Sequence, residues 1–367
     1  MQLFDLQHTY EKHPNTKALN DILNNSSIKT AYISGLAASA APFVFSGIKK
    51  PLLLYVLNDL EEAGYFYHDL MQIAGEEQVL FFPSSYRRAI KYGQRDAANE
   101  ILRTEVLSKV QTIQRKEQKE KSTLHIVTYP EALAELVVSQ EELSEKTLNL
   151  EVGERIESTS VQNKLFEYGF EHVDYVYEPG QFAMRGSILD VFSFSSEYPF
   201  RIDFFGDEIE SIRTFEVENQ LSKEQMKNIT IVPELTDSQQ TNRISFLNFL
   251  PSETILLFKD FLWVQERIQS INEETFSNQA IMVQESESTG KPLIPPSLID
   301  GESFIKSALN FRRIEFGNRP TETMQANLNY DTTAQPIFHK NFDLVCQTFQ
   351  QYLTERYRIF ILADSSK

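Results

Sequence analysis

The sequence predicts an α/β fold in which a parallel-sheet domain is interrupted by a small, hairpin-rich α+β insert. Through about the first 140 residues, fully apolar strand-like runs alternate with helical runs, which is typical of a parallel sheet covered by helices on both faces. The pattern then changes to alternating strands and polar turns, and a buried-strand run returns at residues 251–258. We therefore expect residues 1–145 and 233–367 to form one domain and residues 146–232 to form the insert.

Hydrophobic periodicity places the elements of the parallel-sheet domain. Apolar side chains at Ile101, Val106 and Val110 are spaced for one buried helical face. The elements predicted in the first part are strands at 29–34, 51–57, 78–82 and 123–128, and helices at 59–74, 96–115 and 130–138. Those predicted after the strand at 251–258 are a long loop at 285–303, a helix from Phe338 to Leu353 and a last strand at 358–363. A core strand so near Lys367 suggests that the chain is part of a longer protein.

Composition excludes several classes of protein. A chain of 367 residues has room for two or three domains, and 41% hydrophobic content is typical of a globular protein. No run of eighteen apolar residues exists to span a membrane, and the start lacks the pattern of a signal peptide. The single cysteine, Cys346, excludes an internal disulfide framework and fits a reducing compartment. We therefore expect a cytoplasmic protein.

The formal net charge of −17 argues against nucleic-acid binding over most of the surface, because phosphate backbones are bound by clustered Lys and Arg. Lysines and arginines in residues 114–121 are diluted by glutamates, as in a solvated helix end or linker. Tyr86, Arg87, Arg88 and the nearby Tyr92 form a basic and aromatic cluster that could contact DNA. A short polar loop after a strand explains this cluster equally well.

The most informative part of the chain is residues 177–215. Residues 199–205 alternate, so that Phe200, Ile202 and Phe204 face one side of a strand. The side chains expected on the opposite, exposed side are those of Arg201, Asp203 and Phe205. Gly206 and Asp207 are a two-residue hairpin signal, and Gly186 within an apolar run indicates a bulge or a close backbone approach.

The segment GQFAMRGSILDVF followed by PFRIDFFGDEIESIRTF resembles the segment shared by the bacterial transcription-repair coupling factor (Mfd) family and the excision-repair protein UvrB. The resemblance implies that the insert binds UvrA through Arg185, Arg201 and Phe205, with Asp203 as a supporting residue. We expect truncation of Arg201 or Phe205, taken as exposed, to change folding stability by no more than about 0.5 kcal/mol. The competing interpretation is an ordinary solvated hairpin.

The order and lengths of the flanking elements also resemble the amino-terminal module of that family, a degenerate P-loop NTPase-like domain. In UvrB the first strand leads into the phosphate-binding pattern Gly-x-x-x-x-Gly-Lys-Thr. The matching residues 35–42 keep Gly35 and Ser39 but carry Ala and Pro where Gly, Lys and Thr are needed to hold phosphate. The strand at 255–258 is followed by Lys259 and Asp260, so that a lysine stands where the Mg²⁺-supporting Asp should be. The resemblance therefore implies a degenerate nucleotide site with no cofactor.

Other catalytic patterns are missing from the sequence. The histidines are scattered without an HExxH motif, and a single cysteine offers no Cys pair, so we expect no metal site. Neither a Gly-x-Ser-x-Gly elbow nor a Gly-x-Gly-x-x-Gly fingerprint occurs. No residue is therefore expected to be catalytic.

Two functions follow from these patterns. The first is a non-catalytic fragment of a coupling factor that recruits UvrA to stalled RNA polymerase. The resemblance implies that RNA polymerase and DNA are contacted mainly by other parts of the parent, an ATP-dependent DNA translocase, and that its carboxy-terminal part masks the UvrA-binding face. The alternative is a nucleotide-dependent UvrB-like or helicase-like enzyme, which would need the missing phosphate-binding Lys and the missing acids.

Overall fold

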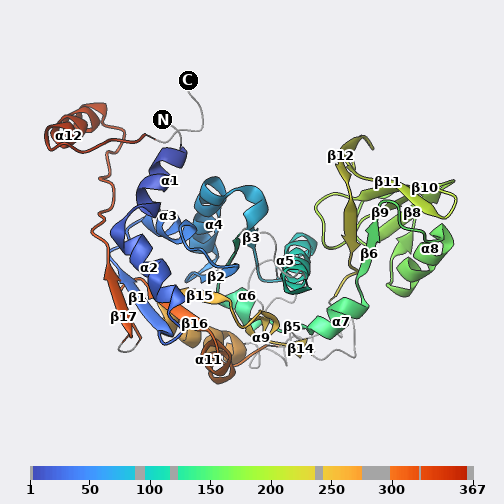
Figure 1. The fold of residues 1–367 in the computed structure, drawn as a ribbon, viewed down its shortest axis with the longest axis horizontal. Helices are drawn as coiled ribbons and strands as arrows, with labels where there is room; N and C mark the ends of the chain where they lie inside the picture. Colours follow the sequence, from blue (N-terminus) through green and yellow to red (C-terminus); the bar gives the residue numbers. More distant parts are fainter. Residues whose placement is uncertain are drawn as a thin grey trace.

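The computed structural model describes residues 3–86, 96–115, 123–235, 243–274, 298–321 and 324–361. Most of the basic and aromatic cluster after Tyr86, most of residues 114–121 and most of the predicted loop at 285–303 lie outside the described residues. Figure 1 shows a large α/β body and, at its right, a second group of strands. No helix among the described residues is long and apolar enough to cross a membrane.

The large body is built on a seven-stranded sheet in the order β17-β1-β16-β15-β2-β4-β3, and all of its strands are parallel. The strands are β1 (Thr30–Ser34), β2 (Leu52–Val56), β3 (Val79–Phe81), β4 (Leu124–Thr128), β15 (Ile255–Lys259), β16 (Arg312–Phe316) and β17 (Ala326–Asn329). The central strands β2 and β4 are buried along their whole length. Such strands read as continuous apolar runs because helices cover both faces of a parallel sheet.

Helices lie on both sides of this sheet (Figure 1), with α1, α3 and α4 on one side and α11 on the other. The helices of the body include α1 (Leu3–Glu11), α2 (Pro14–Asn24), α3 (Ala40–Ser46), α4 (Leu60–Ala74), α5 (Ala97–Arg115), α6 (Pro130–Ala134), α7 (Gln140–Glu145), α9 (Phe246–Phe249) and α11 (Gly301–Ala308), with a short 3₁₀ turn η1 (Glu76–Gln78). Residues 261–274 are helical as well. Asp59 begins α4 by accepting a hydrogen bond from the backbone of Glu62, as expected of an N-cap.

The second group of strands forms a six-stranded sheet in the order β12-β11-β10-β9-β8-β7. Its elements are β7 (Glu171–His172), β8 (Gln181–Arg185), β9 (Ile188–Val191), β10 (Phe200–Phe205), β11 (Glu208–Phe215) and β12 (Ser222–Met226), with α8 (Ser158–Glu167) preceding them. An antiparallel pair, β6 (Leu148–Glu151) and β13 (Asn228–Ile231), joins the start of this region to its end. The apolar side chains between residues 148 and 231 form buried clusters separate from the core of the large body. The division at about residues 145 and 232 stays a prediction.

Most predicted elements of the parallel sheet form within a few residues of their predicted bounds, but two strands were missed and one was wrong. β16 was missed because buried Arg313 and Glu315 interrupt its apolar pattern; these two side chains pair at 2.9 Å. β17, the other missed strand, is short and only partly buried, and it occupies one edge of the sheet. The last predicted strand does not form in residues 358–361, where Ile361 is largely exposed.

Two further predictions need correction. The helix predicted at 130–138 ends at Ala134, and β5 (Val137–Val138) then pairs with β14 (Arg243–Ile244). Gly186 does not mark a bulge. It takes a φ of 62° in the tight turn between β8 and β9, so the apolar run is a hairpin. The bulge lies in the pairing of β10 with β11, between Asp203 and Phe204.

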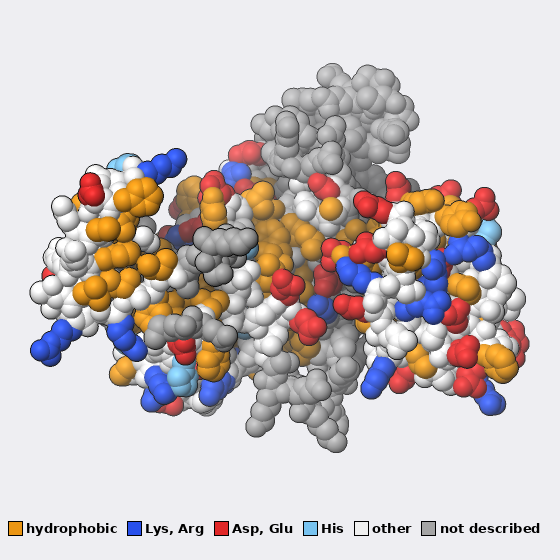
Figure 2. All heavy atoms as spheres, turned by 90° about the horizontal axis from the view of Figure 1, so that it is seen from above, with side chains coloured by type: hydrophobic (Ala, Val, Ile, Leu, Met, Phe, Trp, Pro, Cys, Tyr) orange, Lys and Arg blue, Asp and Glu red, His pale blue; other side chains and the backbone are white. Residues whose placement is uncertain are grey.

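The predicted helix near residue 342 does form, as α12 (Phe342–Thr354), but none of its residues is buried. It projects from the large body in Figure 1, and Figure 2 shows hydrophobic side chains gathered on it.

Phe204 and Phe205 provide the first prediction, because they are adjacent on β10 and face opposite sides. Phe204 is 5% exposed in the apolar cluster of the insert, whereas Phe205 is 78% exposed. We expect Phe204→Ala to lower the free energy of unfolding by about 3–5 kcal/mol, because it leaves a cavity. Phe205→Ala, the matched control, should change it by no more than about 0.5 kcal/mol. Urea unfolding measures both, and equal losses would show that the two faces are misassigned.

A buried histidine provides the second prediction. His125 on β4 hydrogen bonds through Nδ1 to the Tyr55 hydroxyl at 2.9 Å, and burial lowers the pKa of His125 to about 4. The folded-state pKa is therefore below the unfolded value, so this stability is complete above about pH 6.5 and falls as the pH drops toward 4. The loss should be roughly 3 kcal/mol. His125→Asn, which keeps a polar atom near Nδ1, should lack this part of the pH dependence in urea unfolding; an unchanged pH profile would contradict the assignment.

Candidate partner-binding site

The candidate site lies at one end of the insert's sheet, where two tight turns come together. The β8–β9 turn contains Gly186 and the β10–β11 turn contains Gly206, and antiparallel pairing of β9 with β10 brings both turns to the same end. The predicted two-residue hairpin at Gly206 is confirmed, with Phe205 opposite Glu208. The predicted alternation is confirmed as well, since burial along β10 changes at each residue from Phe200 to Phe205.

A buried carboxylate organises this face of the sheet. Asp190 on β9 is fully buried and lies opposite Arg201 on β10. Arg201 donates from Nε to Oδ1 at 2.7 Å and from Nη2 to Oδ2 at 2.8 Å, a bidentate pair that raises the pKa of Arg201. Arg185 on β8 donates from Nη2 to the same Oδ2. One carboxylate thus holds two of the arginines that the sequence predicted as binding residues.

Arg201 is not an exposed side chain, because two segments cover it. Its side chain is 13% exposed and its guanidinium lies 4.3 Å from the centre of the buried Phe215 ring. The backbone carbonyl of Gln220 accepts a further bond from Nη1 at 3.1 Å, and Val176 adds a fully buried side chain to the cluster around Phe215. The expectation that Arg201 is exposed is therefore wrong, and we now expect its truncation to lower stability, since its removal would leave Asp190 with less of its charge compensated.

Of the remaining predicted residues, Phe205 and Arg185 are exposed, whereas Asp203 is mostly covered. Phe205 is 78% exposed at the hairpin end, and the Arg185 side chain is 36% exposed. Asp203 pairs with Arg213 on β11 at 2.9 Å and accepts a hydrogen bond from Ser211 at 3.2 Å. Lys and Arg side chains gather on this side of the molecule beside acidic ones, at the right of Figure 2. The structure thus brings all four residues to one face, with only Phe205 and Arg185 well placed to touch a partner.

Sequence reasoning missed Asp190 and Arg213. In the structure, each lies directly opposite Arg201 on a neighbouring strand. An acid in the otherwise apolar run of β9 also indicates a buried ion pair. The register between the strands, which shows that these residues meet, becomes visible only in the structure.

The predicted degenerate nucleotide site lies at the carboxyl ends of β1 and β15, with β16 between them. After β1, the loop containing Gly35 packs against residues 330–332. Thr332 accepts a hydrogen bond from the Ala37 amide at 2.8 Å and donates one to the Gly35 carbonyl at 2.6 Å. A Cβ on Gly35 would lie 1.6 Å from the carbonyl oxygen of Tyr330. Part of the backbone that would surround a phosphate is therefore engaged within the chain.

The start of α3 is packed against the core, and the residues after β15 form polar contacts within the chain. Ser39 precedes α3 without a side-chain capping bond, and Ala40 and Ala41 are buried. After β15, Lys259 forms an ion pair with Glu62 of α4. Asp260 accepts a hydrogen bond from the Asn318 amide at 3.1 Å. Among the described residues, no three His, Cys, Asp or Glu side chains are grouped so that they could hold a metal ion.

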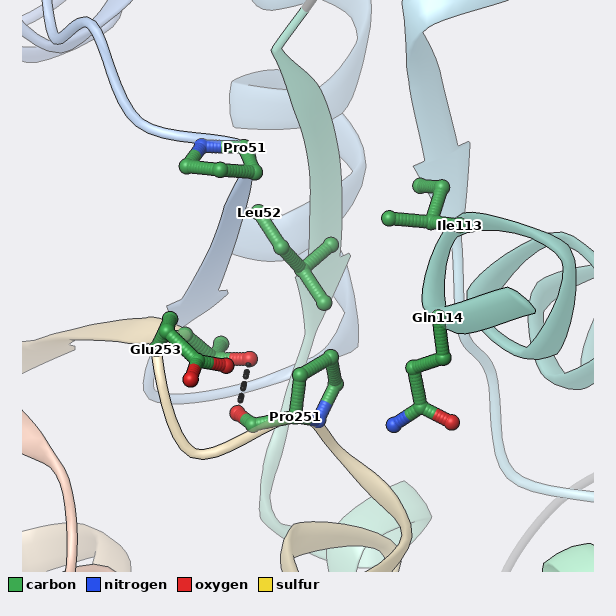
Figure 3. Close-up of a pocket in the computed structure, with 7 residues that line it drawn as sticks. Pro51, Leu52, Ile113, Gln114, Pro251 and Glu253 are labelled. Carbon is green, nitrogen blue, oxygen red and sulfur yellow. Dashed lines mark hydrogen bonds between the residues drawn. The ribbon is translucent and has the colours of Figure 1, made fainter. Parts of the chain in front are cut away.

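A pocket of about 280 Å³ lies elsewhere on the parallel sheet. Figure 3 shows it at the start of β2, with Pro251 and Glu253 on one side and Ile113 of α5 on the other. Thr254 also lines it and donates to the Pro251 carbonyl at 2.7 Å. Open α/β sheets bind ligands at the carboxyl ends of their strands, whereas this pocket lies at the amino ends. It is therefore not a candidate nucleotide site.

Comparisons with known proteins identify the insert. Residues 148–236 match the family described as the UvrB interaction domain. The transcription-repair-coupling factor of Escherichia coli is 41% identical over 86 residues, which cover 23% of this chain and 8% of that protein. That of Bacillus subtilis is 28% identical over 211 residues, covering 56% of this chain and 17% of that protein.

A longer match extends the similarity beyond the insert. The transcription-repair-coupling factor of Staphylococcus aureus is 23% identical over 377 aligned positions, covering 85% of this chain and 31% of that protein. The chain thus spans less than a third of the length of these relatives. The chain therefore contains a UvrB interaction domain and is similar over most of its length to the transcription-repair-coupling factors, as expected of an amino-terminal module of that family.

Proposed function

We propose that this chain acts in transcription-coupled repair, as a non-catalytic part of a coupling factor that recruits UvrA to stalled RNA polymerase. The observation that carries the proposal is the exposed pair of Phe205 and Arg185 on a domain that matches the UvrB interaction family. Hot spots of protein interfaces are enriched in aromatic residues and arginine. The two side chains project from one end of one sheet, so a single partner surface can meet both.

The ion pairs beneath this surface favour binding by holding it in one arrangement. Arg185 bonds to Asp190, which Arg201 anchors to the body of the sheet. A side chain already fixed in its bound geometry loses less conformational entropy when a partner arrives. In this proposal Arg201 and Asp203 are positioning residues, and Phe205 and Arg185 make the contacts.

The large α/β domain, residues 1–145 and 233–367 in this proposal, serves as a scaffold without nucleotide chemistry. The support is chemical, since the position of the phosphate-binding Lys is taken by buried Ala41 and Lys259 is neutralised by Glu62. The alternative, an active UvrB-like enzyme, would need a Lys or Arg in the phosphate-binding loop and acids directly after residues 255–258. In the same proposal the motor, most contacts to RNA polymerase and DNA, and a carboxy-terminal part that masks the UvrA-binding face belong to a longer parent protein.

The binding face provides the third prediction. We expect Phe205→Ala and Arg185→Ala each to weaken binding to purified UvrA at least about thirty-fold, because truncating a hot-spot side chain costs about 2 kcal/mol or more. The melting temperature of Phe205→Ala should stay close to that of the parent, whereas Arg185→Ala should lower it, because this change removes one bond to the buried Asp190. Tyr65→Ala is the matched control, because this ring on α4 is 69% exposed but lies outside the insert. If both insert variants bind like the parent, the interaction face lies elsewhere.

Arg201→Ala provides the fourth prediction, because it should destabilise the fold more than Phe205→Ala or Arg185→Ala. Because it removes a partner of the buried Asp190, we expect a loss of about 3–5 kcal/mol of unfolding free energy together with weaker UvrA binding. Urea unfolding and UvrA titration on the same preparation measure the two effects. Unchanged stability would show that Arg201 does not anchor this face.

The nucleotide site provides the fifth prediction. Titration calorimetry with ATP and Mg²⁺ should give no saturable heat at millimolar nucleotide. ATP should also leave the melting temperature unchanged, whereas a ligand that bound the folded state would raise it. Binding at micromolar ATP that is lost when residues 35–42 are altered would support the enzymatic alternative instead.

A further inference from the structure

A short segment between β7 and β8 adds an aromatic side chain to the exposed site. Within residues 173–178, Val176 is fully buried in the small apolar cluster around Phe215. This anchor leaves the neighbouring rings outside, with Tyr175 52% exposed and Tyr177 57% exposed. Neither tyrosine figured in the sequence-based set of binding residues.

Tyr175 packs against the arginine of the proposed site. The guanidinium carbon of Arg185 lies 4.9 Å from the centre of the Tyr175 ring, within the range of a cation–π contact. The same guanidinium donates from Nη1 to the Asp174 carbonyl at 3.0 Å and from Nη2 to Asp190. The segment therefore holds Arg185 from one side while Asp190 holds it from the other.

This arrangement leaves Arg185 able to bind another group. An arginine has five N–H donors, and within the part of the chain that the structure describes Arg185 uses two of them. Asp190 carries one negative charge against the two positive charges of Arg185 and Arg201, so the cluster keeps a net positive charge at its exposed end. A planar anion fits the free donors, because a carboxylate can accept two parallel N–H bonds from a guanidinium.

The surroundings favour a carboxylate of a protein over the phosphates of DNA or RNA. Acidic side chains at Asp174 and Glu178 lie on the same segment, and the chain as a whole carries a net charge of −17. Such a surface repels a polyanion. It does not prevent one acidic side chain, presented by a docked protein surface, from reaching a single arginine.

We propose that Tyr175 and Arg185 together form a clamp for an aspartate or glutamate side chain of the partner, an inference that rests on the proposed UvrA-binding function. The Tyr175 ring covers one face of the guanidinium and holds it in place. It also excludes water from the ion pair, which strengthens the charge-assisted bonds. Tyr175 is a positioning residue that also adds apolar contact area.

The test is a double-mutant cycle on UvrA affinity. Tyr175→Ala should weaken binding about tenfold, and it should add little to the loss already caused by Arg185→Ala, because coupled residues are not additive. Tyr175→Phe, which keeps the ring, and Tyr177→Ala, which removes an equally exposed ring two residues away, should each stay within about twofold of the parent. The Tyr175 and Tyr177 variants should melt like the parent, and Arg185→Ala should melt lower because it removes one bond to the buried Asp190.

The outcomes separate the clamp from the proposed function. If Tyr175→Ala binds as well as the Tyr177→Ala control, or if its loss simply adds to that of Arg185→Ala, the clamp is wrong while UvrA binding through Phe205 stands. If Phe205→Ala and Arg185→Ala both bind like the parent, the proposed function fails. The carboxylate is tested by charge exchange: Arg185→Glu should lose binding, and one Asp or Glu of UvrA changed to Arg should restore it. Failure of every such change to restore binding would overturn the carboxylate assignment.

Discussion

The exposed face of the insert depends on the buried carboxylate of Asp190. An unpaired charge in this position would be strongly unfavourable, so the fold must supply its partners. Arg201 supplies a bidentate pair from the next strand and Arg185 a further bond from the strand on the other side. The Phe215 ring and the Gln220 carbonyl then contact Arg201. The charge of Asp190 therefore fixes the position of two arginines. One of them, Arg185, extends toward solvent.

At the carboxyl ends of the parallel strands, polar groups are paired within the chain. In an open α/β sheet, the carboxyl ends of the strands form the usual place for a ligand. Here the Gly35 loop bonds to Thr332, Lys259 pairs with Glu62, and Asp260 accepts the Asn318 amide. These contacts join the ends of β1 and β15 to other parts of the same chain. Such an edge suits a scaffold that carries the insert, which is the role proposed for this domain.

The positions of several strands, and the face on which their side chains lie, could be predicted from the sequence because local patterns determine them. Apolar runs located β2, β4 and β15, and period-two alternation placed Phe204 inside and Phe205 outside. The prediction failed where the outcome depends on distant contacts. β16 carries a buried Arg313–Glu315 pair that looks like a polar loop in sequence. Arg201 looked exposed because alternation reports which face a side chain is on, but not whether another segment covers that face.

Hydrogen–deuterium exchange with and without UvrA tests the central claim most directly, since it locates the contact without any substitution. The account predicts that UvrA slows exchange of backbone amides at the β8–β9 and β10–β11 turns, around Gly186 and Gly206, and leaves residues 35–42 unchanged. Slowed exchange only in the large α/β domain, with both turns unaffected, would contradict it.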